Sequence, residues 1–411
     1  MKNRRRIVSV FLVFILIFAN FNQVWAAEAP EISEIEDQTQ ALLVANPETG
    51  QVFYSKNPKK VLGIASMTKV MTYLLVKDDI SDGKYKPEDL VKIDEEVSKF
   101  ATPGNSRMEL KVGEQVSVDD LLKGLMVVSG NDAATALAKK SAGSVEVFSK
   151  KMNEKARELG LDDAHFINPT GLSEEKTVKN KKQIDYNKMS AVSLLKLAKH
   201  VVVKYPEVSE YGKLENLSMP ERNYIGEHTH GMYKSIPGLL GLKTGYTLEA
   251  MYNFVGYVDM NLYEKGQKFK LITVVTGAET EMLREEATRS LIKYVNDNYK
   301  YMDILDYDLQ FPVVDYEARD TKAGVFPLYL EKPVEGIFPK GANPEITYET
   351  FEDKKAPYED GEILGKVIVK YENEELGQVN LINKGYKAKL NFFSRMIQSL
   401  KDLVRKLMLI F

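Results

Sequence analysis

Cysteine is absent from the 411 residues, and this absence removes several classes of chemistry at once. The chain can form no disulfide, use no thiolate nucleophile and carry no lipid on a cysteine, so its function is indifferent to the redox state of its surroundings. An excess of positive charge is also missing, because the formal net charge is −3 and no basic patch stands out. Nucleic acid is therefore not an expected partner.

Metal-ligand spacings and the usual histidine-dependent serine motif are missing as well. The four histidines are His165, His200, His228 and His230, and none belongs to an HExxH string or a similar ligand spacing. No Gly-x-Ser-x-Gly elbow occurs, which leaves a Ser-His-Asp triad unsupported. We therefore predict neither a metal nor a cofactor.

A hydrophobic run of the length that spans a bilayer is not found near the N-terminus. Residues 7–18 form an apolar run of about 12 residues that follows a basic stretch and precedes small residues at Val24 and Ala26. This arrangement is typical of a signal peptide over residues 1–26, cleaved after Ala26 or Ala27. It predicts an exported protein at the outer face of the cytoplasmic membrane or in the cell wall, with an uncleaved anchor as the alternative.

Two domains are expected from the length of the chain and from a change in the residue pattern near residue 303. Residues 27–40 are polar and acidic and predict a disordered lead-in. Residues 41–300 combine short β-type runs with helical stretches, for which we predict an α/β sandwich with helices flanking a mostly antiparallel sheet. Residues 303–386 carry short β-type runs separated by Pro and Gly, and they predict a small all-β domain.

Residues 390–411 differ from both domains. At helical spacing their apolar side chains fall on one side, with Leu409 as the one exception, and the polar side carries four bases and one acid. This pattern suits a helix that lies in the membrane interface and is too polar on one face to span the bilayer. Docking on the β domain or on a partner protein is the alternative.

Three short strings follow one another along the chain: Ser66-Met67-Thr68-Lys69, Ser129-Gly130-Asn131 and Lys243-Thr244-Gly245. Five Ser-x-x-Lys strings occur, and about two are expected by chance at this composition, so the first string alone means little. Only the string at Ser66 is followed, in order, by the other two. This ordered triplet is the strongest functional signal in the sequence.

The first string suits nucleophilic catalysis. Ser66 and Lys69 are one helical turn apart, which lets the lysine nitrogen reach the serine hydroxyl. Lysine can take the serine proton once burial and a nearby cation such as Lys243 lower its pKa. Backbone N–H groups at the start of a helix would also be near for an oxyanion. On its own, Ser66 fits a helix N-cap better than a nucleophile.

The other two strings supply a proton relay and an anchor. Ser129 can pass a proton between a base and a leaving nitrogen, and the Asn131 amide can hold a substrate amide. Lys243 and Thr244 suit a carboxylate, and Gly245 lets a ligand backbone approach a strand. Taken singly, the second string also fits a capped helix start and the third a turn into a hairpin. Together the strings favour serine acyl transfer at the carboxyl end of a peptide.

The sequence around these strings resembles the D-alanyl-D-alanine carboxypeptidases, the low-molecular-mass penicillin-binding proteins. The resemblance rests on residues 65–72, 128–134 and 241–247, and it extends to residues 152–156 and 165–172, to the β domain and to the amphipathic tail. One departure is Met251, which follows Ala250 where the family usually has a glycine. It lies outside the three strings and concerns local strand packing.

The resemblance implies a β-lactamase/transpeptidase-like catalytic domain. Ser66 would attack the carbonyl between the two terminal D-alanines of a peptidoglycan stem peptide, with Lys69 as the base and Ser129 helping to return the proton. Water would then hydrolyse the acyl-enzyme, and β-lactam antibiotics would acylate the same serine.

The resemblance also implies how the substrate is held. Lys243 and Thr244 would bind the terminal carboxylate, beside Gly245 and Asn131. The backbone N–H groups of Ser66 and Tyr246 would form the oxyanion hole.

Two alternatives remain open at this point. A β-lactamase would need a group that activates water for fast deacylation, typically a Glu on a loop after the second string, and residues 162–168 offer two Asp and no Glu. A non-hydrolytic penicillin-binding sensor or wall-binding protein could keep the same fold, but intact Ser66, Lys69, Ser129 and Lys243 argue against it.

Overall fold

The computed structural model describes residues 31–178, 181–305, 312–318, 325–351, 354, 356, 358–372, 374–386 and 396–397. The predicted signal peptide and nearly all of the predicted tail helix lie outside these residues. The chain divides into two compact units, one ending at Val295 and the other beginning at Asn296. Within the described ranges, every helix is too short or too polar to cross a bilayer.

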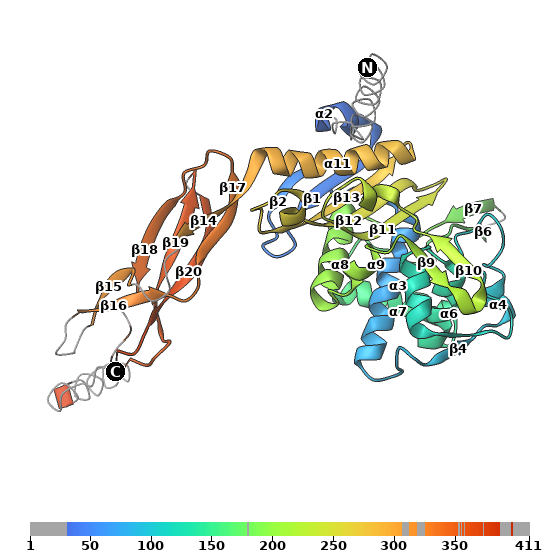
Figure 1. Cartoon of the computed structure of the whole chain (residues 1–411), viewed down its shortest axis with the longest axis horizontal. Helices are drawn as coiled ribbons and strands as arrows, with labels where there is room; N and C mark the ends of the chain where they lie inside the picture. Colours follow the sequence, from blue (N-terminus) through green and yellow to red (C-terminus); the bar gives the residue numbers. More distant parts are fainter. Residues whose placement is uncertain are drawn as a thin grey trace, which may run out of the picture. The chain divides into compact units, whose positions relative to one another are not determined.

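A five-stranded antiparallel sheet forms the centre of the first unit, in the order β11-β12-β13-β1-β2. Its strands are β1 Ala41–Ala45, β2 Val52–Lys56, β11 Leu239–Thr247, β12 Met251–Asp259 and β13 Lys270–Ala278. Helix α11 Glu281–Asn298 covers one face of the sheet (Figure 1). The other face is covered by α3 Lys69–Ser81, α6 Asn131–Ala142, α7 Val145–Glu158 and α8 Ala191–Lys204. Every residue of β1 is buried, as expected for a strand with both faces covered.

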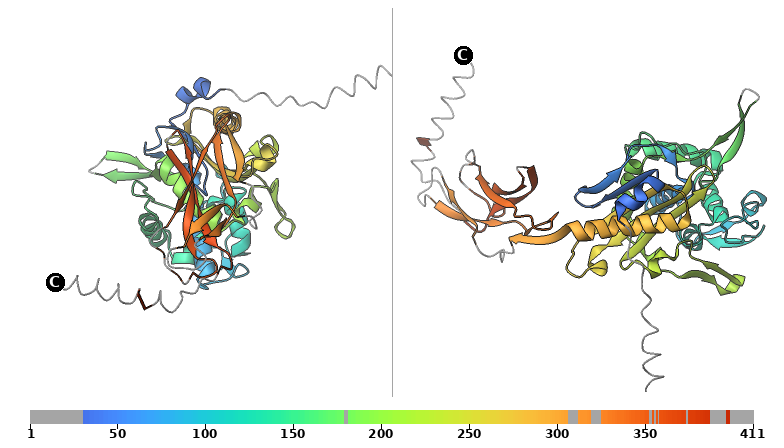
Figure 2. Two further views of the ribbon diagram at one scale, coloured as in Figure 1. Left: turned by 90° about the vertical axis from the view of Figure 1, so that its left-hand side faces the viewer. Right: turned by 90° about the horizontal axis from the view of Figure 1, so that it is seen from above.

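The helices and turns of this unit surround the sheet. They are α2 Ile32–Ile35, η1 Glu36–Gln38, η2 Ala65–Thr68, α3 Lys69–Ser81, α4 Glu95–Ser98, α5 Val118–Met126, α6 Asn131–Ala142, α7 Val145–Glu158, α8 Ala191–Lys204, α9 Val208–Tyr211, η3 Pro220–Arg222, η4 Gly231–Lys234, α10 Met260–Tyr263 and α11 Glu281–Asn298. Four two-stranded ladders complete it: β3 Leu62–Gly63 with β8 Lys188–Met189, β4 Leu90–Lys92 with β5 Gln115–Ser117, β6 Glu174–Val178 with β7 Lys181–Asp185, and β9 Asn216–Met219 with β10 Tyr224–Glu227. The β6–β7 hairpin extends away from the rest of the unit in both views of Figure 2.

The start of the described chain corrects one prediction. Residues 31–38 form the short helix α2 and the turn η1 instead of a disordered segment, and Ile32 and Ile35 are buried. These two isoleucines, one helical turn apart, gain enough burial to order the segment despite its acidic composition. A hairpin follows, in which β1 and β2 pair and Asn46 Oδ1 accepts from the N–H groups of Glu48 and Thr49 in the turn.

The second unit is built from strands. β14 Tyr299–Leu305 pairs with β17 Val334–Pro339, and a five-stranded antiparallel sheet has the order β15-β16-β20-β19-β18. The strands of that sheet are β15 Val314–Glu317, β16 Val325–Leu330, β18 Glu345–Thr350, β19 Ile363–Tyr371 and β20 Glu374–Asn383. Its core contains Phe326, Leu328, Tyr358, Leu364 and Leu381. Both predictions of fold class, an antiparallel α/β sandwich and a small all-β domain, are confirmed.

Two of the three strings lie at the starts of helices, and the third lies in the edge strand of the central sheet. Ser66 lies in η2, directly before α3, and Ser129 lies directly before α6. Lys243, Thr244 and Gly245 belong to β11, which is the edge strand of the central sheet.

Candidate active site

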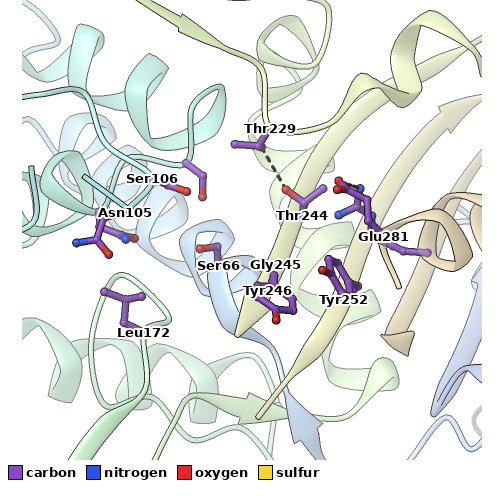
Figure 3. Close-up of a pocket in the computed structure, with 14 residues that line it drawn as sticks. Ser66, Asn105, Ser106, Leu172, Thr229, Thr244, Gly245, Tyr246, Tyr252 and Glu281 are labelled. Carbon is purple, nitrogen blue, oxygen red and sulfur yellow. Dashed lines mark hydrogen bonds and ion pairs between the residues drawn. The ribbon is translucent and has the colours of Figure 1, made fainter. Parts of the chain in front are cut away.

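The three strings meet at one pocket of the first unit, with a volume of about 450 Å³ (Figure 3). The pocket is lined by Ser66, Gly104, Asn105, Ser106, Ser129, Asn131, Leu172, Thr229, Thr244, Gly245, Tyr246, Tyr252, Glu281 and Arg284. Residues from every string contribute, although the strings are far apart in the sequence. The juxtaposition predicted from their order is therefore present in the folded chain.

Lys69 is the buried centre of the site. Its Nζ lies 2.9 Å from Ser66 Oγ, 2.8 Å from Asn131 Oδ1 and 2.7 Å from the Thr170 carbonyl oxygen. A neutral amine has two N–H groups and one lone pair, so it can donate to Asn131 and Thr170 while it accepts the proton of Ser66. This geometry fits a base that is ready to activate the serine.

The electrostatic surroundings favour that neutral form. Burial lowers the pKa of Lys69 well below its usual value, because the ammonium ion loses its hydration, and the positive charge of Lys243 lowers it further. The carboxylate of Asp132 opposes this shift and is outweighed. Lys243 thus acts as the second cation that the sequence suggested.

Two glycines lie against the backbone that carries Ser66. A Cβ at Gly171, which has φ +86°, would lie 2.0 Å from the Ala65 carbonyl oxygen. A Cβ at Gly245 would lie 2.6 Å from the Ile64 carbonyl oxygen and 3.0 Å from the Ser66 nitrogen. The protein's own main chain therefore requires glycine at both positions, and β11 passes directly beside Ser66.

Ser129 stands at the junction of α5 and α6. It has the left-handed φ of 59°, is only 3 % exposed and lines the pocket. The residue that caps α6 is Gly130, and no side chain caps this helix, so the capping interpretation of the second string does not apply. Asn131 starts α6 and turns its Oδ1 toward Lys69.

Lys243 and Thr244 lie together at the other end of the pocket. Thr229 Oγ1 is 3.2 Å from Thr244 Oγ1 and 3.5 Å from Lys243 Nζ. Burial lowers the pKa of Lys243 to about 7, and the nearby Arg284 guanidinium contributes to the shift. Arg284 is itself 3 % exposed and pairs with Glu281 at 2.8 Å. The cluster of cations and hydroxyls suits an anionic group such as a carboxylate.

Tyr246 marks the mouth of the pocket. Its ring is half exposed and lies 4.3 Å from the ring of Tyr252, measured between centroids. The side chain therefore contributes an aromatic wall, next to the backbone N–H for which the sequence singled this residue out.

Sequence reasoning missed several residues of the site. Arg284 and Thr229 belong to no short motif, and only tertiary folding brings them to Lys243. Asp132 accepts hydrogen bonds from the backbone N–H groups of Met108 and Leu110, which holds the neighbouring loop of Asn105 and Ser106 in place. Its position directly after the second string was the one available signal.

Comparison with known proteins agrees with this geometry. The profile of the peptidase S11 family, D-alanyl-D-alanine carboxypeptidase, matches residues 25–280. D-alanyl-D-alanine carboxypeptidase DacF of Bacillus subtilis (strain 168) is 29% identical over 405 residues, which is 97% of this chain and 98% of the relative.

Similar solved structures are penicillin-binding proteins. Penicillin binding protein 5 from Haemophilus influenzae is 25% identical, with a TM-score of 0.68 over 85% of this chain and 97% of its own. Penicillin-binding protein D2 from Listeria monocytogenes in its cefotaxime-bound form is 28% identical, with a TM-score of 0.53 over 62% of this chain and 96% of its own. The chain therefore belongs to the D-alanyl-D-alanine carboxypeptidase family and is a serine-type carboxypeptidase.

Proposed function

We propose that Ser66 is the nucleophile of this carboxypeptidase and that Lys69 is its base. The observation that carries the proposal is the 2.9 Å separation of Lys69 Nζ and Ser66 Oγ, around a lysine whose burial favours the neutral amine. Lys69 takes the hydroxyl proton as Ser66 Oγ attacks the carbonyl carbon between the last two D-alanines of a peptidoglycan stem peptide. The N–H groups of Ser66 and Tyr246 stabilise the oxyanion.

The second string completes the first half of the reaction. Ser129 passes the proton from Lys69 to the nitrogen of the terminal D-alanine, which leaves as a free amino acid. Asn131, which lines the pocket and contacts Lys69, hydrogen bonds the substrate amide. Water then attacks the ester on Ser66 and releases the shortened stem peptide.

The terminal carboxylate binds at the cationic end of the pocket. Lys243 and Thr244 hold it beside Gly245, and Arg284 adds a second buried cation that the sequence had not indicated. This anchor explains a preference for the free carboxyl end of a peptide, because an internal peptide bond brings no such charge.

β-Lactam antibiotics acylate the same serine in this proposal. The related Listeria protein was solved in a cefotaxime-bound form, and it resembles the present chain with a TM-score of 0.53. Glu281 is the one carboxylate among the residues that line this pocket, and it is paired with Arg284 beyond Thr244 (Figure 3). Apart from this paired Glu281, the described residues that line the pocket include no carboxylate that could activate water, so we expect the acyl-enzyme to break down slowly, which argues against a β-lactamase.

The enzyme acts outside the cytoplasm, at the outer face of the cytoplasmic membrane. The basic and apolar N-terminal pattern supports export, and peptidoglycan is the substrate of the family. The amphipathic pattern of residues 390–411 supports attachment to the membrane surface.

Mass spectrometry of the penicillin-treated protein tests the assignment. We expect one adduct, on the peptide that contains Ser66, and loss of both adduct and D-alanine release in Ser66→Ala. Ser81→Ala is the matched control, because Ser81 begins another Ser-x-x-Lys string but is exposed at the end of α3. An adduct on a different serine, or D-alanine release that persists in Ser66→Ala, refutes the proposal.

A further inference from the structure

The carboxylate end of the pocket contains a residue from a separate turn. Thr229 lies between β10 and η4, and its hydroxyl reaches both Lys243 and Thr244 of β11. Its backbone N–H donates to the Val127 carbonyl at 3.0 Å. The position of this hydroxyl therefore depends on the conformation of the turn that carries it.

A histidine closes that turn. The backbone N–H of His230 donates to Nδ1 of His228 at 3.3 Å, with Thr229 between them. The bond spans two residues, as in the turns that Asn and Asp side chains make with the following backbone. Nδ1 can accept only when it carries no proton, so His228 must be a neutral imidazole with its proton on Nε2.

The surroundings of the His228 and His230 side chains favour neutral imidazoles. His230 is 1 % exposed, and among the described residues neither of its ring nitrogens has a hydrogen-bond partner. The His228 and His230 rings are 4.2 Å apart between centroids and pack against Tyr233, while Phe254 faces His230. The two imidazoles therefore lie in a cluster of aromatic rings.

Nearby cations act in the same direction as burial. Burial and the charge of Lys243 lower the pKa of His228 to about 4, against a backbone hydrogen bond with Tyr211 that favours the charged form. The pKa of His230 is also lowered, by burial first and then by His228, Lys243 and Arg284. Protonation of His228 would turn its Nδ1 from an acceptor into a donor and add a further charge beside Lys243.

We propose that His228 is a positioning residue for the terminal carboxylate: its neutral imidazole closes the turn that holds the Thr229 hydroxyl beside Lys243 and Thr244. This inference rests on the proposed function of that anchor and refines it. His228 touches the substrate nowhere in this mechanism and acts through Thr229.

Two substitutions at one position give a sharp test in the full-length protein. In His228→Asn the side-chain Oδ1 can accept the same bond from the His230 N–H, whereas His228→Leu cannot. Loss of one hydrogen bond predicts a KM about 10-fold higher for an N-acyl-D-Ala-D-Ala substrate in His228→Leu, with kcat little changed. His228→Asn should stay within about threefold of the wild type.

A substrate that ends in D-alaninamide is the control, since it has no carboxylate to position. Both variants should process this amide as slowly as the wild type does. An unchanged KM in His228→Leu, or an equally raised KM in a folded His228→Asn, overturns the inference. A wild type that releases no D-alanine from the substrate with the free carboxylate refutes the proposed function itself.

Affinity at acid pH supplies a second readout. Substrate binding is measured at several pH values between 7 and 4 for two proteins, Ser66→Ala and the double variant Ser66→Ala/His228→Asn. Both proteins contain Lys69, so its titration affects both measurements in the same way. Affinity should fall more steeply toward pH 4 when His228 is present. Nitrogen-15 spectra of the wild type must also show an unprotonated Nδ1 at neutral pH, and a proton on that atom contradicts the inference even if His228→Leu does not fold.

Discussion

At the scale of single residues, Lys69 and Lys243 differ in pKa because their surroundings differ. Lys69 is fully buried and faces a second cation, and both features favour a neutral amine. Lys243 keeps a pKa of about 7, so its charge is present below neutral pH and fades above it. In the proposed mechanism, the same type of side chain therefore serves as the base at Lys69 and as the carboxylate anchor at Lys243.

The pKa of Lys243 predicts how binding responds to pH. Its value is lowered to about 7, so the empty site loses the Lys243 charge as pH rises from 7 toward 9. We expect KM for a substrate with a free carboxylate to rise severalfold over that range, with Arg284 limiting the loss. Steady-state kinetics at stepwise pH check this, and the D-alaninamide substrate should show no such rise. A flat KM up to pH 9 contradicts the assignment of the anchor.

Sequence patterns identified the residues of the site that belong to short strings. The spacing of Ser66 and Lys69 alone implies contact, because three residues make one helical turn. Arg284 carries no such signal: it lies in an amphipathic helix where an arginine is ordinary, and only the packing of α11 against the sheet brings it to Lys243. The role of Gly245 also needed the structure, since its crowding comes from Ile64 and Ser66.

At the scale of elements, the start of β12 carries a strained residue. Met251 has φ 60°, in the left-handed region where a side chain costs about 1–2 kcal/mol. Asn253 Nδ2 donates to the Met251 carbonyl at 3.0 Å and helps to fix the conformation. The glycine that the family usually has here would adopt this φ freely, so the departure noted in the sequence is a local cost in stability.

Replacing this methionine should stabilise the protein. Met251→Gly removes the strain and adds some backbone entropy to the unfolded chain, for an expected net gain of about 0.5–1 kcal/mol in the free energy of unfolding. Met251→Ala keeps the strain and is the control, so it should bring no gain. Denaturant unfolding of the three proteins measures the difference, and a less stable Met251→Gly shows that the methionine side chain matters more than its backbone.

Element boundaries were harder to predict than element types. The helix expected from Ser66 begins as the tighter turn η2 and becomes α3 only at Lys69. The reason is tertiary, because the backbone at Ser66 is confined between Gly171 and Gly245. The prediction of a disordered lead-in was wrong because it relied on the acidic composition of the segment. Composition does not show that Ile32 and Ile35 are buried in the folded chain.

At the scale of the whole molecule, the catalytic elements all belong to the first unit. The pocket residues end at Arg284, before the division at Val295, and the second unit has its own core. Activity should therefore not require the chain's last residues. Only the sequence pattern supports their role in membrane attachment.

Deleting residues 391–411 tests that role. The shortened protein should move from the membrane fraction to the soluble fraction, because the apolar face that binds the bilayer is gone. Its D-alanine release should match that of the full-length chain. Fractionation before and after the deletion is the measurement, and an unchanged distribution rules out this tail as the attachment.

If Ser66 is the nucleophile, the two glycines beside it, Gly171 and Gly245, limit which mutations can give resistance to an inhibitor of the enzyme. A target often becomes resistant by adding bulk near the atom that an inhibitor attacks. Here a side chain at Gly171 or Gly245 would push the main chain that carries Ser66, and so separate the hydroxyl from its base. A mutation that excludes the inhibitor by this route sacrifices turnover of the natural substrate as well.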